Sequence, residues 1–362
     1  MALTTDKTVS ATTSTAIVLA SAWNAQRGAV VQEPTSLKYW ALTDLNDTSG
    51  PSVYYSTNGT AWTREKITGA GSVSIVSQAI YLGSDESLYI CIESWVVRVV
   101  KITIHKRDII TGTWTSVNTT FSNANWGGGF CQDSERNIHH VCTQRTFEGA
   151  YPWIVANLIY TKYTNGVLST PRLISNYTLS FPTSFESCKT NFSSQYDGST
   201  FIVEHAGKIL VFWQHVYYVN GTTTFYYTPR YAEVPASGYI SSPINLRAQS
   251  TTLWLPVAPR SNGNLYCLLI NDAARKAKKL YRNGIDITPT TDADHWGNWM
   301  DVKQYEIAKN DDIMMHGNDD RIGGGVAAFQ LRKSGTWFAT QVTSPRKYYP
   351  VGCLTYMPRK FR

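Results

Sequence analysis

Aromatic and cationic side chains fall on the irregular segments of this chain, outside its repeated pattern. Trp153, Trp296 and Trp299 are the aromatic examples, and Arg145 and Arg321 are the cationic ones. An indole ring presents a large apolar area at low entropy cost, which suits both sugar faces and partner proteins. A guanidinium group binds a carboxylate through two parallel hydrogen bonds. We therefore predict that these five residues form a ligand-binding surface.

Two acidic clusters have residue types that can bind metal ions. Residues 292–295 (Asp-Ala-Asp-His) lack the glycine and the terminal glutamate of a calcium loop, and residues 310–312 (Asn-Asp-Asp) are separated from Asp319 by a predicted strand. His139 and His140 are consecutive on a strand, so their side chains point to opposite faces. We interpret the carboxylates as solvated turn residues and predict no metal and no cofactor.

A glycine repeat indicates which elements would position these side chains. In residues 53–67, two β-rich runs flank Asn58-Gly59, which is a strong hairpin signal because both residues tolerate a positive φ. A small residue followed by glycine recurs at Gly112, Gly166, Gly238, Gly284 and Gly335. Three copies are followed by a tryptophan, at Trp62, Trp114 and Trp337, which we expect to be a packing residue.

An apolar strand precedes each glycine hairpin. These strands begin at Leu37, Leu88, Ile138, Ile209, Leu265 and Ile313, at spacings of 51, 50, 71, 56 and 48 residues. A strand–turn–strand unit repeated about every 50 residues is typical of propeller blades. The sequence therefore predicts an all-β, six-bladed β-propeller with four-stranded antiparallel blades.

The ends of the chain complete this prediction. Residues 1–14 are rich in Thr and Ser and are expected to form a flexible arm, whereas residues 15–362 form a single propeller domain. The N-terminal strands and residues 347–357 are expected to share one blade, because closure of the ring removes open sheet edges. Residues 272–280 are the one segment predicted as a helical turn or two.

The connections predict two different ends of the ring. Turns at residues 83–87, 133–137 and 261–264 are short and polar. The long connections predicted for the opposite end are residues 117–128, 144–156, 175–190, 289–299 and 317–325. Loops on a rigid scaffold carry function more often than short turns do. We therefore place the binding surface at the end with the long connections.

The bulk composition agrees with a β protein. Of the 362 residues, 43% are hydrophobic and 16% charged, and the net charge is +7, which permits an anionic partner without requiring one. The sequence has neither an apolar run long enough for a membrane span nor a signal peptide, so we expect synthesis in the cytoplasm and no membrane insertion. The six cysteines show no metal-binding spacing and are expected to be buried free thiols.

The run Ser56-Thr-Asn-Gly-Thr-Ala-Trp62 resembles the Asp-box of sialidase-like propellers, shortened by one residue. The resemblance implies a propeller in which the box is a structural turn far from the active site. A sialidase mechanism would need three arginines around a carboxylate, a Tyr-Glu pair and an acidic proton shuttle. The residues available for these roles are Arg145, Arg247, Arg321 and Arg346, with Glu148, Tyr151, Tyr217, Asp319 and Asp320. The family's Arg-Ile-Pro signature is missing.

The polar β-rich composition, the N-terminal arm and the degenerate repeat also resemble bacteriophage virion proteins. We expect binding rather than catalysis: a non-catalytic component of the virion, either a tail-associated adhesin or an assembly protein. Its partners would be other virion proteins and a host surface glycan. One alternative is a sialidase-like glycoside hydrolase acting on anionic glycans. A second is a channel-forming tail nozzle, the one case in which nucleic acid would be a partner.

Overall fold

The computed structural model of the protein describes about two thirds of the chain. The described residues are 30–42, 51–58, 61–69, 75–96, 99–122, 124–147, 154–177, 179–180, 184–189, 201–219, 225–251, 254–257, 264–271, 276–288, 300–307, 313–319, 326–333, 336–337 and 341–344. Every regular element within these ranges is a β-strand, and all pairs are antiparallel.

The strands form successive sheets along the chain. The first contains β1 (Val30–Gln32), β2 (Tyr39–Leu42), β3 (Ser52–Ser56) and β4 (Thr63–Lys66) in that order. The second contains β5 (Ile75–Leu82), β6 (Leu88–Val96), β7 (Val99–Arg107) and β8 (Trp114–Ser122). The third runs from β9 (Ala124–Gln132) through β10 (Ile138–Phe147) and β11 (Ile154–Thr164) to β12 (Val167–Leu168), and β13 (Arg172–Leu173) also pairs with β11.

The second half of the chain continues the series. The fourth sheet joins β14 (Leu179–Ser180), β15 (Ser184–Lys189), β17 (Lys208–Val219), β18 (Phe225–Glu233) and β19 (Ile244–Asn245), with β16 (Phe201–His205) also paired to β17. The fifth joins β20 (Trp254–Val257), β21 (Tyr266–Asn271), β22 (Lys276–Arg282) and β23 (Ile285–Asp286). The sixth joins β24 (Met300–Ile307), β25 (Ile313–Asp319), β26 (Val326–Lys333) and β27 (Thr336–Trp337), with β28 (Gln341–Ser344) also on β26.

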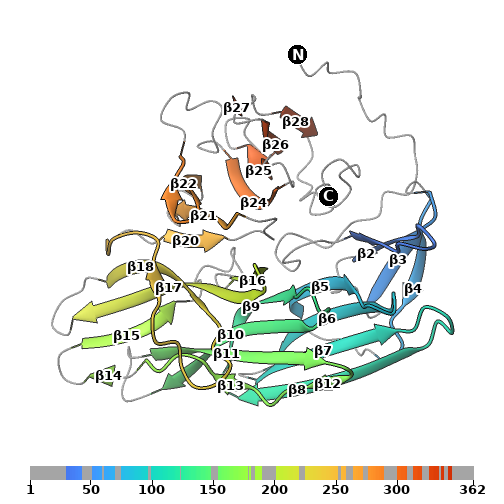
Figure 1. Ribbon diagram of the computed structural model, residues 1–362, viewed down its shortest axis with the longest axis horizontal. Helices are drawn as coiled ribbons and strands as arrows, with labels where there is room; N and C mark the ends of the chain where they lie inside the picture. Colours follow the sequence, from blue (N-terminus) through green and yellow to red (C-terminus); the bar gives the residue numbers. More distant parts are fainter. Residues whose placement is uncertain are drawn as a thin grey trace.

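The sheets follow one another around the molecule (Figure 1), from the blue first sheet at the right, through the green and yellow sheets, to the orange strands at the top. Consecutive sheets pack against each other, since β5 of the second sheet contacts β9 of the third and β9 contacts β16 of the fourth. This is the arrangement expected of propeller blades. The blade that the N-terminal strands and residues 347–357 were predicted to share is not tested, because residues 1–29 and 345–362 lie outside the described residues. A closed ring of six blades therefore stays a prediction.

The second sheet is buried on both faces, and its second strand shows this most clearly. In β6, Leu88, Ile90 and Ile92 pack toward the first sheet, while Tyr89 and Cys91 pack toward the third. Neighbouring side chains of a strand point to opposite faces, so burial of both faces requires an uninterrupted apolar run. The repeated apolar strand of the sequence is therefore the strand held between two neighbouring sheets.

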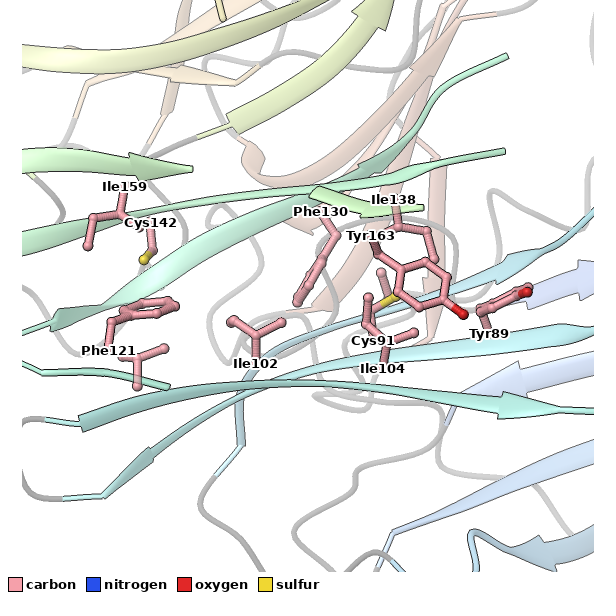
Figure 2. Packing of buried hydrophobic residues seen from close by; sticks show 12 residues of the cluster. Tyr89, Cys91, Ile102, Ile104, Phe121, Phe130, Ile138, Cys142, Ile159 and Tyr163 are labelled. Atoms are coloured by element: carbon pink, nitrogen blue, oxygen red, sulfur yellow. The ribbon is translucent and has the colours of Figure 1, made fainter. Parts of the chain in front are cut away.

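Figure 2 shows the seam between the second and third sheets. Ile102 and Ile104 of β7 face Phe130 of β9 and Ile159 of β11 across this seam. Cys91 and Cys142 lie in the same cluster as free, buried thiols, as do Cys131 and Cys267 in the neighbouring seams. Burial raises the pKa of the Cys142 thiol, and the negative charge of Glu93 adds to the effect. The prediction of buried free thiols is confirmed for these four residues.

Two of the predicted glycine hairpins, at Gly166 and Gly284, are confirmed as tight two-residue turns. Asn165 and Gly166 join β11 to β12 with φ values of 50° and 88°, and Asn283 and Gly284 join β22 to β23 with 51° and 79°. Two successive positive φ angles define the type I′ turn that matches the twist of antiparallel strands. Gly59 and Gly335 lie outside the described residues.

The repeat tryptophan of the second sheet helps to join two sheets. Trp114 Nε1 donates a hydrogen bond of 2.9 Å to Glu65 Oε1 on β4, and Arg107 Nε donates one of 2.6 Å to the same oxygen. The Trp114 ring is partly buried against the seam of the first two sheets. Its predicted packing role is therefore confirmed.

Two predictions about local structure were wrong. Residues 117–128 are not a long loop, because β8 continues to Ser122 and β9 begins at Ala124. Residues 272–280 are not helical where described, because Lys276–Arg282 forms β22. In both segments, pairing with a neighbouring strand supplies the backbone hydrogen bonds, and local composition does not reveal that partner.

Gly128 should tolerate no side chain. A Cβ placed there would lie 2.4 Å from Glu93 Oε2 and 2.5 Å from the carbonyl oxygen of Val141, so Gly128→Ala should lower the free energy of unfolding by about 2 kcal/mol or more. Gly166→Ala is the matched control, because its Cβ would meet nothing within 4 Å and the cost would come from positive φ alone, about 1 kcal/mol. Urea denaturation of both variants tests the difference, and equal losses would contradict the steric account.

Candidate functional site

The two ends of the sheets differ in chemistry. We define the turn end by residues 33–38, 83–87, 133–137 and 206–207, which join the first and second strands, and the loop end as the opposite end. Thr35 Oγ1 donates a 2.5 Å hydrogen bond to Glu86 Oε1, so two of these turns lie side by side. The second strands run from the turn end to the loop end.

A belt of buried polar residues crosses three consecutive sheets in the half nearer the loop end. Glu93, Thr143 and Gln214 each lie five residues after the start of the apolar run in their second strand, and each is 0% exposed. The residues that follow are Ser94, Gln144 and His215, of which Ser94 and His215 are also buried. We call these six residues the polar belt. Its uniform place in three strands suggests a functional requirement, because buried polar groups in a core are costly without partners.

Glu93 is the charged group of the belt, and it connects two sheets. Its Oε2 accepts a 3.0 Å hydrogen bond from the Gly128 amide and lies 2.9 Å from His140 Nε2. The His140 ring packs against Phe130 with ring centroids 4.6 Å apart. The carboxylate is therefore held between a backbone N–H and an imidazole in an otherwise apolar seam. The carboxylate is thus a fixed hydrogen-bond acceptor that links the second and third sheets in the half of the seam nearer the loop end.

Thr143 and Gln214 use little of their hydrogen-bonding capacity. Within the described part of the chain, Thr143 Oγ1 and Gln214 Oε1 have no hydrogen-bond partner. Gln214 Nε2 donates to the carbonyl oxygen of His215 at 3.0 Å. A buried hydroxyl or amide oxygen without a partner costs about 1–3 kcal/mol, so keeping these two atoms buried lowers the stability of the fold.

A polar network ties the third and fourth sheets together beside the belt. Asn157 Oδ1 accepts hydrogen bonds from the Tyr177 amide at 2.7 Å and from Ser175 Oγ at 3.1 Å. Trp213 Nε1 donates to Tyr177 Oη at 3.1 Å, and the Tyr177 ring lies 5.3 Å from that of His215. The residues around the belt are thus rigidly positioned, as a binding or catalytic site requires.

Burial keeps the belt histidine neutral. Desolvation, together with the positive charge of Arg230, lowers the pKa of His215 to about 3. Desolvation and Lys101 similarly lower the pKa of His105, on β7, to about 4. At neutral pH both imidazoles are uncharged.

A second polar group lies at the turn end. His139 Nε2 is 2.9 Å from Asp133 Oδ2, and His139 Nδ1 is 2.6 Å from Tyr160 Oη. Burial opposes ionisation of Asp133, but hydrogen bonds from Asn137 and His139 outweigh it and lower its pKa. Desolvation raises the pKa of Tyr160 to about 12, so the tyrosine stays protonated and donates to the imidazole. This arrangement fixes a turn and is not placed to activate a tyrosine. His139 and His140 point into different seams, as predicted.

Most of the predicted binding residues cannot be placed. Trp153, Trp296, Trp299 and Arg321 lie outside the described residues. The backbone of Arg145 lies in β10, opposite Ala156 of β11, but its side chain is not among those described. This position is two residues beyond Thr143, so the predicted arginine and the polar belt lie on the same end of the same strand.

Two other candidate residues lie beside the loop half of the fourth sheet. Tyr217 lies near the loop end of β17, where its ring centroid is 6.5 Å from that of Tyr226. Arg247 lies between Leu246, whose amide donates to the Pro229 carbonyl oxygen, and Ser250, which bridges to Tyr227. Pro229 and Tyr227 pair with Gln214 and Val216 of β17, so the backbone of Arg247 is level with the polar belt.

Sequence reasoning missed the belt, although it carries a visible signal. The apolar runs after Leu88, Ile138 and Ile209 each change to polar residues at the same step, as Glu-Ser, Thr-Gln and Gln-His. Among the described residues, no group of three or more His, Cys, Asp and Glu side chains could hold a metal ion. The described part also contains no helix long and apolar enough to cross a membrane.

Solved structures similar to this chain identify the fold. No family model and no curated protein matches the sequence. An ulvan lyase, described as a new family of polysaccharide lyase, aligns with a TM-score of 0.51 and 10% identity over 90% of this chain and 84% of its own. A second polysaccharide lyase, Uly1, has a TM-score of 0.46 with 10% identity over 83% of this chain and 76% of its own. An arabinofuranosidase of Fusarium graminearum has a TM-score of 0.45 with 10% identity over 84% of this chain and 91% of its own.

These structures correct the expected function. The expectation of a non-catalytic virion component is corrected, because the structure that aligns with a TM-score of 0.51 is a polysaccharide lyase, an enzyme. The tail-nozzle alternative is likewise not carried further. The all-β propeller fold is confirmed by the likeness to the ulvan lyase over nine tenths of the chain.

The lowered pKa of His215 should make stability depend on pH. Its folded pKa of about 3 lies below the unfolded value near 6.5, so the unfolded state takes up a proton that the folded state refuses. The contribution is complete above pH 6.5 and is lost toward pH 3, by about 1.4 kcal/mol per pH unit. In His215→Gln, the free energy of unfolding should therefore fall less steeply as the pH is lowered, by about 1.4 kcal/mol per pH unit less than in wild type. Urea denaturation between pH 7 and pH 4 measures this difference.

His105→Gln provides an independent second case, because the folded pKa of His105 is about 4. In the double variant with His215→Gln, the pH dependence of the free energy of unfolding between pH 6.5 and pH 4 should be weaker than in either single variant. An unchanged slope in both single variants would show that these imidazoles are not held neutral.

Proposed function

We propose that this protein is a carbohydrate-active enzyme that cleaves an anionic polysaccharide at the loop end of a six-bladed propeller. The observation that carries the proposal is the structural likeness to an ulvan lyase over 90% of the chain. Because identity is 10%, no catalytic residue is transferred from that enzyme. The six described sheets supply the proposed blades, and the Asp-box-like turn at Ser56 supports a relationship to sialidase-like propellers.

The Asp-box-like turn has the hydrogen bonds expected of a structural turn. Asn58 Oδ1 accepts a 2.9 Å hydrogen bond from the Ala61 amide, and Ser56 Oγ donates to the same oxygen at 3.1 Å. In this role the asparagine replaces the aspartate of the family motif. The turn follows β3, the third strand of the first sheet, and we assign it no part in the proposed reaction.

An anionic substrate is favoured by the charge of the chain. The protein carries 33 Lys and Arg against 26 Asp and Glu, for a net charge of +7. A net positive charge raises the local concentration of a polyanion and its rate of association.

We propose that Arg145, Arg321, Trp153, Trp296 and Trp299 contact the substrate at this end. The arginines would neutralise its acidic groups, and the indoles would stack on sugar rings. Trp296→Ala should then raise KM by about thirtyfold, the equivalent of roughly 2 kcal/mol, without changing the melting temperature. An unfolded variant, or an unchanged KM, would remove Trp296 from the site.

The reaction class can be tested directly. The purified protein is incubated with ulvan, alginate, polygalacturonate, sialylated glycans and, as a neutral substrate, arabinan. A hydrolase releases reducing ends alone, whereas a lyase also creates an unsaturated uronate that absorbs in the ultraviolet. Cleavage of at least one anionic glycan is expected. Cleavage of arabinan alone would refute the anionic substrate, and no cleavage of any polymer by the folded protein would count against the enzyme.

Thr143 provides a test of where the site lies. Thr143→Val removes a buried hydroxyl that has no partner within the described chain, so stability should be unchanged or rise by up to about 1 kcal/mol. If the hydroxyl supports the site, kcat/KM should fall about tenfold. Thr161→Val is the matched control, because Thr161 is also 0% exposed with an unpartnered hydroxyl among the described residues, but lies outside the belt on β11. Equal activity in both variants would move the site away from Thr143.

A further inference from the structure

A cavity of about 510 Å³ lies at the turn end, between the first two sheets. Its walls come from the β1–β2 turn, from Glu86 of the β5–β6 turn and from the hairpin between β7 and β8. In Figure 1 these elements meet where the blue first sheet adjoins the cyan second sheet. The volume falls within the range of about 300–1,000 Å³ common to small-ligand sites. This cavity is on the opposite end from the polar belt and plays no part in the proposed reaction.

One wall of the cavity is a preorganised carboxylate. Glu33 is 3% exposed, and its Oε1 accepts a 2.5 Å hydrogen bond from Trp40 Nε1, while its Oε2 accepts one from the Ser36 hydroxyl. A carboxylate has about four lone-pair sites, so two acceptor positions remain after these bonds. The folded chain therefore holds a fixed hydrogen-bond acceptor at the edge of an open volume.

The opposite charge in the cavity comes from Lys38 and Arg107. Lys38 Nζ lies 4.1 Å from the centroid of Tyr55 and 4.7 Å from that of Trp40, and among the described residues it forms no salt bridge. Its three N–H donors are therefore free for a ligand. The Arg107 guanidinium also lies over Trp40, at 4.9 Å, and is already paired with Glu65.

The balance of charges selects the class of ligand. The lining carries two acidic side chains, Glu33 and Glu86, and two basic ones, Lys38 and Arg107, so it has no net charge with which to favour an anion or a cation. A neutral polyhydroxyl compound can donate to the carboxylates and accept from Lys38 at the same time. Ile109 and Ile110 complete the lining, and Ile110 is 91% exposed, which leaves an apolar patch for the C–H face of a sugar ring.

From this combination we propose that the cavity binds a neutral saccharide unit, as a second carbohydrate site separate from the reactive end. Glu33, Glu86 and Lys38 hydrogen-bond its hydroxyl groups, and Ile110 covers its apolar face. Binding to isolated sugars is weak, with a millimolar dissociation constant, because a small polar ligand gains little beyond its entropic costs. The site would hold the protein on a polysaccharide that contains neutral sugars, independently of cleavage.

The experiment uses the full chain and neutral trisaccharides as probes: cellotriose, xylotriose and maltotriose. Saturation-transfer NMR and quenching of tryptophan fluorescence report binding, with glucuronic acid and glucosamine as charged comparators. At least one trisaccharide is expected to bind, and Lys38→Ala and Glu86→Gln should each weaken it at least tenfold. Lys106→Ala is the matched control, because Lys106 is at the same end but pairs with Asp85 at 2.7 Å and does not line this cavity.

Several outcomes would overturn the proposal. It fails if none of the three probes binds, if Lys38→Ala and Glu86→Gln both bind as wild type does, or if a charged comparator binds more tightly through the same residues. Melting temperatures identify any variant that is not folded, and Glu86→Gln, which keeps the shape of a partly exposed side chain, is expected to fold even if Lys38→Ala does not. Cleavage of polysaccharide is measured separately, so loss of one site does not imply loss of the other.

Discussion

The structure depends on the packing of each sheet, face to face, against the sheets before and after it. A single four-stranded sheet has two apolar faces and cannot bury both alone. In this chain Leu88, Ile90 and Ile92 use one face of β6, and Tyr89 and Cys91 use the other. Each fully buried aliphatic or aromatic side chain contributes about 1.5–3 kcal/mol, so the seams supply most of the stability. The repeated apolar strand in the sequence is a consequence of this packing, because every sheet must present similar apolar faces to its neighbours.

The seams are not uniform along their length, and this difference separates the two ends. Near the turns the packing is mainly aliphatic and aromatic, with polar groups such as His139 and Glu33 that hold the turns, and toward the loop end the described strands carry buried Glu, Thr, Gln and His. A carboxylate such as Glu93 is stable there because the Gly128 amide and the His140 ring surround it. Removing either neighbour would leave a buried charge without its partner, which is costly. The apolar half therefore supports the fold, and the polar half is where a site can be built.

The difference between the packed sheets and their connecting loops explains why the fold could be predicted better than the function. A propeller scaffold accepts many activities, because the residues that bind and react lie on connections that packing does not constrain. The expectation of a non-catalytic virion protein depended on composition, which describes the scaffold. The likeness to a polysaccharide lyase confirms the propeller fold, and the polar belt marks the end at which we propose that the site lies.

Local features of the chain were readable from the sequence because their causes are local. Asn165-Gly166 and Asn283-Gly284 form hairpins because both residues tolerate positive φ, and the apolar run beginning at Leu88 marks a strand buried on both faces. Tertiary structure decided which distant groups meet. Gly128 must be a glycine because Glu93, 35 residues away, comes within hydrogen-bond distance of its amide. Lys38 and Glu86 share a cavity only because two turns from different sheets lie side by side. Such contacts follow from how the sheets pack, which no short stretch of sequence contains.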